Sequence, residues 1–234
     1  MEIMDFRPFF ISIRVAFIAT AITFLLGLAA ANAVCKLKRG KGVIDSILTL
    51  PLILPPTVAG FFLLLLFGKN SFIGAFLNSL DISVVFSLAG AVIASTVVAF
   101  PLMYRTARGS FEQLDQNIIY AAETLGASEI KIFWTIKVPL AKPGILAGTI
   151  LAFARALGEF GATIMLAGNI PGRTQTMAIA VYSAVQGGNR ELAFKWVGVL
   201  CLISLVMMIL LNYAVPGPQR NKKRAVKQAI EDRV

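Results

Sequence analysis

The chain has 234 residues, of which 57% are hydrophobic and 15% are charged, where a soluble domain carries about 25% charged residues. The mean hydropathy is +0.79. These values exclude a disordered chain, a collagen-like chain and an ordinary soluble domain, and they indicate an all-α, polytopic membrane protein. We expect one membrane domain over residues 1–219, followed by a basic tail at 220–234.

Five apolar segments are each long enough to cross a bilayer, since a membrane-spanning helix takes about 20 residues. They lie at about 15–34, 47–67, 84–104, 144–167 and 196–215. Strands are disfavoured because no segment alternates apolar with polar residues. The first segment has the wrong polarity for a signal peptide, because its basic run follows the apolar stretch, so we expect a retained anchor.

Residue types that carry chemistry are scarce. The chain has no histidine and two cysteines, Cys35 and Cys201, neither placed like half of a disulfide framework. It has no phosphate-binding glycine-rich loop with Lys-Ser or Lys-Thr, and no convincing pair of catalytic carboxylates. The sequence therefore predicts no catalytic residue, no metal site and no cofactor, and it favours a transport protein over a membrane-embedded enzyme.

Basic residues indicate the orientation. Most of the 22 Lys and Arg residues fall in three alternate segments, 36–41, 105–142 and 220–233. Because such residues stay on the cytoplasmic side, we expect a multi-pass protein of the cell membrane with its N-terminus outside and its C-terminus in the cytoplasm. The tail has no aromatic residue to stack on a base, so we expect it to meet the lipid bilayer and no nucleic acid.

Two features inside the predicted spans suggest a translocation pathway. Pro55 and Pro56 interrupt the second span before Thr57, and a broken membrane helix is tolerated where it packs in protein or faces water. Arg155 and Glu159 are the only charges deep in a span, and at a spacing of four they share a helix face and can pair.

A structural role remains open for both features, as a static kink and as an ion pair that ties the fourth span to its neighbours. The glycines of the fourth span suit close helix packing. The candidate residues for a pathway, gate or subunit interface are Pro55, Pro56, Thr57, Arg155, Glu159 and Gly161.

The polar segment 110–142 predicts a helix–turn–helix on the cytoplasmic face. Residues 117–125 fit a short helix, and Gly126 is placed to end it in the left-handed conformation. Ser128 can cap a second short helix, which Pro139 is expected to stop.

The apolar residues of this segment leave two interpretations open. Ile130, Phe133 and Trp134 form an apolar edge at helical spacing, which suits either docking to a partner or lying on the bilayer surface. In the outer loop at 168–195, residues 176–185 are semi-apolar but too short to span, so we expect a surface or re-entrant helix there.

The same segment resembles the cytoplasmic coupling loop of ABC importer permeases, in which Glu-Ala-Ala is followed after three residues by Gly and after nine more by Ile-x-Leu-Pro. The matching residues are Tyr120, Ala121, Ala122, Gly126, Ile136, Val138 and Pro139. Tyr120 replaces the family's Glu, which removes one possible polar contact, and Val138 replaces its Leu. In that family, the loop sits in a groove of a cytoplasmic ATPase and transmits its motion to the spans.

The resemblance extends to molybdate permeases through the segments 50–60, 100–103, 153–163 and 169–176. It implies a type I importer permease that works as a homodimer, with a cytoplasmic ABC ATPase dimer and an extracytoplasmic molybdate-binding protein. Permeases for tungstate, or for sulfate and thiosulfate, share much of the pattern and remain alternatives. A stand-alone anion channel or secondary transporter is an alternative of another class, which leaves the loop pattern unexplained.

Overall fold

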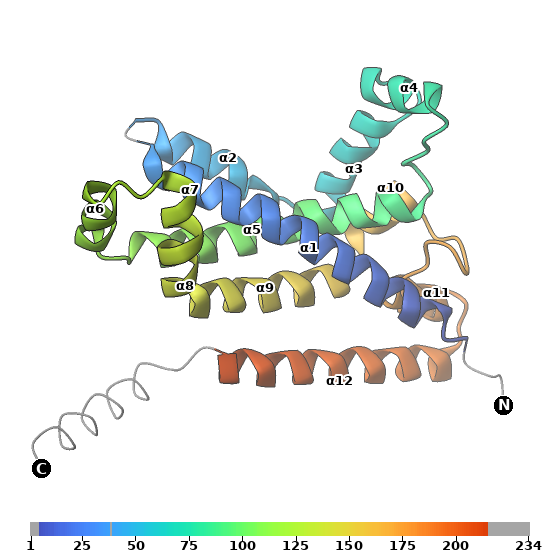
Figure 1. Ribbon diagram of the computed structural model, residues 1–234. Coiled ribbons are helices and arrows are strands. Elements are labelled where there is room, and N and C mark those ends of the chain that lie inside the picture. Colours follow the sequence, from blue (N-terminus) through green and yellow to red (C-terminus); the bar gives the residue numbers. More distant parts are fainter. Residues whose placement is uncertain (1–4, 38, 215–234) are drawn as a thin grey trace, which may run out of the picture.

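The computed structural model describes residues 5–37 and 39–214, which are largely helical and contain no strand (Figure 1). Three helices are long and apolar enough to cross a membrane: α1 (Arg7–Lys36), α5 (Leu88–Glu112) and α12 (Arg190–Ala214). Two bent helix pairs meet the same test, which gives up to five spans. The predicted tail at 220–234 lies outside the described residues.

The second predicted span consists of two helices, α2 (Lys41–Ile53) and α3 (Pro56–Phe67), that meet at an angle of 108°. The break falls at the two prolines singled out in the sequence. Proline has no N–H to continue a helical ladder, but it suits the first position of a new helix, which Pro56 occupies. The helix α4 (Phe72–Ser79) follows and stands apart from the other helices, beyond the far end of α3 (Figure 1).

The fourth predicted span, 144–167, is also interrupted. Its helix α9 (Lys142–Leu157) ends before Gly158, and a short helix, α10 (Gly161–Ala167), begins three residues later. The carboxylate oxygen Oε1 of Glu159 accepts a hydrogen bond from the N–H of Ala162 at 2.7 Å. This side chain satisfies one of the free N–H groups at the start of α10, so a second helix can begin here.

The third predicted span, 84–104, is shifted along the chain. Helix α5 begins at Leu88, where the hydroxyl of Ser87 accepts a hydrogen bond from the N–H of Gly90 at 3.2 Å. It continues to Glu112, well into the segment expected to be a loop. In the outer loop, the semi-apolar stretch forms α11 (Met177–Gln186), and the N–H of Met177 donates to the hydroxyl of Ser12 on α1 at 2.8 Å.

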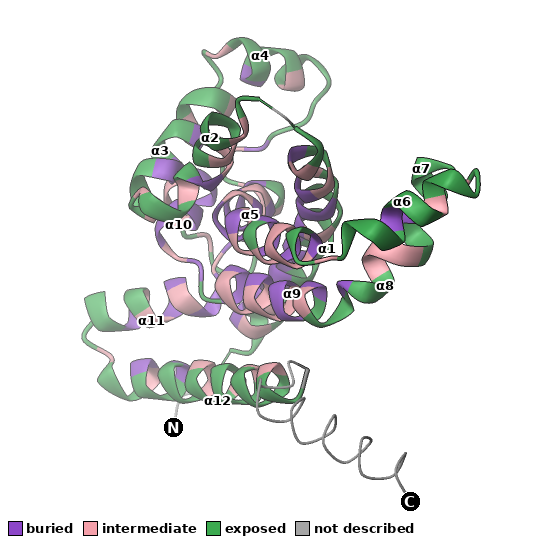
Figure 2. Cartoon of the chain, turned by 90° about the vertical axis from the view of Figure 1, so that its left-hand side faces the viewer, coloured by how far each residue is buried: buried purple, intermediate pink, exposed green. Residues whose placement is uncertain are grey.

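The core lies between α1, α5 and α9, where many buried residues are alanines (Figure 2). Small side chains let helix backbones approach closely, which is the usual basis of packing between membrane helices. At Gly27 of α1, an added Cβ would lie 2.7 Å from Cγ of Met103 on α5. Helix α12 stands further out and packs mainly on α9 and α11.

Residues 116–140 form a projecting hairpin at one end of the helices (Figure 1). It comprises α6 (Gln116–Thr124), α7 (Glu129–Ile132), the π-helical turn η1 (Phe133–Lys137) and α8 (Val138–Leu140). The expectation that Pro139 stops the second helix is wrong, because helix continues through it to Leu140. The π-turn closes with the N–H of Val138 on the carbonyl of Phe133, which places Pro139 in the first turn of α8, where a missing N–H costs little.

Candidate functional site

The turn of the projecting hairpin has a defined helix-ending geometry. Gly126 has a φ of 78°, in the left-handed region that the sequence predicts. Its N–H donates to the carbonyl of Glu123 at 2.9 Å, and the N–H of Ala127 donates to that of Ala122 at 3.0 Å. These two bonds make a Schellman motif, in which Ala122 and Gly126 have fixed positions. Ser128 then caps the next helix through the N–H of Lys131 at 3.4 Å.

The hairpin is held to the long helices at several points. Glu129 pairs with Lys36 at the end of α1, and the hydrogen bond from Lys36 lowers the pKa of the Glu129 carboxyl. The ring of Phe133 packs on that of Phe111 with centroids 5.9 Å apart, and Ile132 is buried beside them. These contacts attach the hairpin to α1 and α5.

The outer face of the hairpin exposes large apolar side chains. They are Tyr120, Leu125, Ile130 and Trp134, and Leu125 at the tip is 87% exposed. Of the predicted apolar edge, only Phe133 turns inward. The other residues that match the coupling-loop pattern differ in burial: Ala121 and Pro139 are exposed, while Ile136 and Val138 are half-buried. The hairpin thus has exposed apolar side chains and is attached to α1 and α5 by the contacts described above.

The two helix breaks pack against each other, which brings together residues from separate predicted spans. An added Cβ on Gly161 would lie 3.1 Å from both Cβ of Pro56 and the backbone nitrogen of Thr57. An added Cβ on Gly60 would lie 2.7 Å from Cα of Ala162. We call this contact between the two breaks, residues 54–60 and 158–162, the broken-helix junction. Pro55 and Thr57 lie on its exposed side.

The charged pair predicted in the fourth span is formed at this junction. Nη1 of Arg155 lies 2.7 Å from Oε2 of Glu159, whose side chain is 1% exposed against 29% for that of Arg155. Oε1 of Glu159 accepts a hydrogen bond from the first turn of α10, and Oε2 is ion-paired with Arg155. Glu159 therefore fixes the start of α10. Only Arg155 is accessible, and its charge is balanced by Glu159, so the pair as it stands offers no free charge to an anion.

A second charged cluster, which the sequence reasoning missed, ties α2 to α5. Arg108 pairs with Asp45, and its Nε donates to Oε1 of Glu112 at 2.9 Å. Lys41 lies 2.6 Å from the same oxygen, and the hydroxyl of Tyr104 donates to Asp45 at 3.0 Å. The predicted span ends at residue 104, which would place Arg108 in a loop. The spacing of Arg108 and Glu112, four apart, is the signal that would have revealed a helix there.

Within the part of the chain that the structure describes, no group of three His, Cys, Asp or Glu side chains could hold a metal ion. The features that the structure assembles are the projecting hairpin, the broken-helix junction and the charged cluster between α2 and α5.

Comparison with known proteins places this fold. The chain resembles the permease of the MetNI methionine ABC transporter in an inward-facing conformation, with a TM-score of 0.70 and 15% identity, covering 90% of this chain and 94% of that one. It also resembles a chain of a bacterial ABC transporter that imports alginate, with a TM-score of 0.72 and 11% identity, covering 92% of this chain and 78% of that one. The fold is therefore that of an ABC importer permease.

The family described as "Binding-protein-dependent transport system inner membrane component" matches residues 23–222, and the chain belongs to it. The putative molybdenum transport system permease protein YvgM of Bacillus subtilis (strain 168) is 47% identical over 88% of this chain and 92% of its own length. ModB of Escherichia coli (strain K12) is 41% identical over 88% and 90%. The sulfate permease CysW of Synechocystis is 36% identical over 86% and 73%.

The chain is thus a membrane-embedded transport subunit of an ABC importer. It is not an enzyme, since in such importers ATP hydrolysis lies with a separate ATPase.

Proposed function

We propose that this chain forms the translocation pathway of an ATP-driven importer of molybdate. The observation that carries the ATP-driven part is the projecting hairpin, with exposed Leu125 at its tip and an ion pair between Glu129 and Lys36 that joins it to α1. A face of this kind suits the groove of an ATPase better than the bilayer surface, because it points beyond the ends of the spans (Figure 1).

The choice of molybdate rests on the relatives. Three molybdenum permeases are 41–47% identical to this chain, whereas two sulfate permeases are 36% identical; ModB of Azotobacter vinelandii, at 32%, lies below both. An external binding protein for molybdate would deliver the ion. Active transport suits this cargo, because importing a dianion against an inside-negative potential costs about 4.6 kcal/mol per 100 mV, twice the value for one charge.

The proposed orientation places the projecting hairpin in the cytoplasm and α11 outside. The basic segments 36–41 and 105–142 then lie on the cytoplasmic side, in keeping with the distribution of Lys and Arg in membrane proteins. The ATPase dimer would bind on the side of the hairpin, and the binding protein on the side of α11.

The working unit is proposed to be a homodimer. Helices α2 and α3 leave Val43, Ile47, Ile53 and Phe62 more than half exposed, and the broken-helix junction has one open side with Pro55 and Thr57. A two-fold pair of chains would cover this side and enclose a path between two junctions. In that assembly, the junction would serve as gate or pathway lining.

The experiment is uptake of labelled molybdate into vesicles that contain this chain, with and without its ATPase and binding protein, and with tungstate and sulfate as competitors. We expect uptake that requires ATP and both partners and that tungstate, but not sulfate, blocks. Uptake by this chain alone would contradict the importer mechanism and revive a channel. Uptake blocked by sulfate would keep the mechanism and change the cargo.

A further inference from the structure

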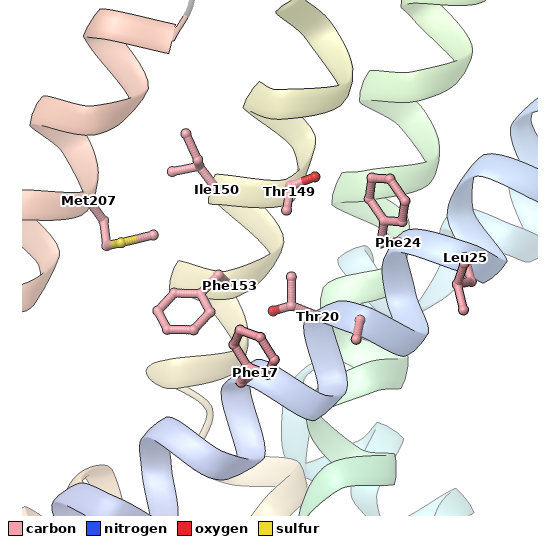
Figure 3. A pocket seen from close by; sticks show the side chains of 9 residues that line it. Phe17, Thr20, Phe24, Leu25, Thr149, Ile150, Phe153 and Met207 are labelled. Carbon is pink, nitrogen blue, oxygen red and sulfur yellow. The ribbon is translucent and has the colours of Figure 1, made fainter. Parts of the chain in front are cut away.

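An apolar groove opens between three of the long helices, α1, α9 and α12 (Figure 3). Its volume is about 560 Å³. Phe17 and Phe24 of α1 and Phe153 of α9 form its walls, and Met207 of α12 faces them across the gap. The groove exists because α12 packs loosely: only 6% of its most apolar window is buried, against 39% for α1.

The groove offers no polar group to a ligand. Its two hydroxyls are used within their own helices: Thr20 donates to the carbonyl of Ala16 at 2.6 Å, and Thr149 donates to that of Ile145 at 2.8 Å. An oxyanion would find no donor here. The part of a ligand that fills the groove must therefore be apolar, and it must come from the hydrocarbon core in which these helices lie.

Size selects among apolar occupants. From Phe17 to Leu25, the groove follows eight residues of α1, or about 12 Å at 1.5 Å per residue, close to the half-thickness of a hydrocarbon core of about 30 Å. A helix of that length and about 10 Å across would occupy roughly 900 Å³, so it could enter the groove only in part. A lipid acyl chain from one leaflet meets both limits.

A positive charge lies beyond one end of the groove, outside the residues that line it. Lys142 precedes Thr149 by seven residues on α9, so both lie on the same face of that helix, about 10 Å apart along its axis. Lys142 is exposed and has no ion-pair partner among residues 5–37 and 39–214. In the proposed orientation it sits at the cytoplasmic surface, where anionic headgroups lie.

We propose that the groove between α1, α9 and α12 binds a single anionic phospholipid, with an acyl chain against Phe17, Phe24 and Phe153 and its headgroup at Lys142. The orientation of the headgroup rests on the proposed function, and occupancy of the groove does not. The lipid fills the space that protein side chains leave open beside α12.

The first test counts phospholipids that stay bound to the purified full chain by native mass spectrometry. Ala21 lines the groove, whereas Ala29 is exposed on the same helix outside it. Ala21→Phe, which displaces about two methylenes, is expected to weaken retention roughly tenfold, and the matched Ala29→Phe to leave it unchanged. Equal retention by both variants, or none by the natural chain, would overturn the proposal.

A second measurement does not depend on the fold tolerating Ala21→Phe. A protein without its natural tryptophans, made by Trp134→Phe and Trp196→Phe, receives a single tryptophan. The residue is placed in the groove by Phe153→Trp or on the exposed outer part of α1 by Phe10→Trp. Its fluorescence is then quenched with brominated lipids. After exchange into ordinary lipid, quenching should persist at position 153 and vanish at position 10. Equal loss at both positions contradicts a bound lipid, and quenching at neither indicates that protein fills the groove.

A third experiment tests the assignment of the lipid headgroup to Lys142. In vesicles of mixed phosphatidylglycerol and phosphatidylethanolamine, the natural chain should co-purify with the anionic lipid, and Lys142→Gln should remove that preference. An unchanged preference would overturn the assignment of the headgroup to Lys142. Molybdate uptake is not a readout in any arm, so failure here is distinguishable from failure of the proposed function.

Discussion

Glu159 initiates the helix that begins two residues after it, because its Oε1 accepts the N–H of Ala162 at 2.7 Å while its other oxygen lies beside Arg155. A residue that sequence reasoning treats as one half of an ion pair therefore also defines the backbone path at the broken-helix junction. The two roles can be separated by substitution.

The first prediction concerns Glu159. Removing one partner of a fully buried pair costs about 3–5 kcal/mol, and we expect a smaller cost here because the charge left behind, that of Arg155, is 29% exposed. We expect Glu159→Ala to lower the apparent melting temperature of the purified protein most. Glu159→Gln should lower it less, since the amide oxygen still accepts from Ala162. Combining Glu159→Gln with Arg155→Met should recover much of the loss. A double variant no more stable than Glu159→Gln would contradict a charge-pair role.

The second prediction tests the contact of α3 with α10. Gly60→Ala would place a Cβ 2.7 Å from Cα of Ala162, and such overpacking costs about 1–3 kcal/mol. We expect a lower melting temperature and lower ATP-dependent uptake. Gly198→Ala is the matched control, because nothing lies within 4 Å of a Cβ added there on α12. Equal effects of the two substitutions would show that helix flexibility, and not the close contact, is responsible.

The third prediction concerns the turn of the projecting hairpin. At Gly126, with φ of 78°, a left-handed conformation costs an ordinary L-residue about 1–2 kcal/mol, and a β-branched one more. Gly126→Val should leave the protein in the membrane but reduce ATPase binding and coupled uptake by roughly tenfold. Gly126→Asn should retain most of both, because Asn tolerates this conformation. Full coupling by Gly126→Val would contradict the assigned role of the hairpin.

The fourth prediction addresses the cluster between α2 and α5. Thr49 is the one buried residue of α2. The ion pairs of Asp45 and Lys41 therefore supply much of the attachment of α2 to α5. Asp45→Asn should speed hydrogen–deuterium exchange in residues 41–53 by several-fold and leave that of α1 unchanged. Asp81→Asn makes the same chemical change where the structure has no ion pair. If both variants exchange alike, the cluster does not hold α2.

The parts of the fold that follow local rules could be predicted from the sequence. The break at Pro55–Pro56 and the left-handed turn at Gly126 each depend on one residue type with one backbone property. The break after Leu157 is harder to predict, because the spacing of Glu159 suits both an ion pair with Arg155 and a helix cap on Ala162.

Other features depend on contacts distant in sequence. The path of the chain through Pro139 is set by the π-turn at Phe133, whose ring packs on Phe111 of α5. The spacing of Arg108 and Glu112 indicates helix locally, but the attachment of this end of α5 to α2 depends on Arg108 meeting Asp45. Neither partner can be chosen from one sequence, so the junction and the cluster emerged only in three dimensions.

The π-helical turn takes up one residue of the hairpin without changing its direction. A π-turn holds one residue more than an α-turn, so its five residues rotate the chain about as far as four residues of an α-helix, at about 100° each. Deleting one residue from 133–137 would therefore restore a regular helix and leave Ile130 and Leu125 facing nearly as they do now. A deletion in the regular helix α9 would instead turn the whole hairpin by about 100° around the helix axis. The hairpin can thus lose a residue at this one turn and keep its direction.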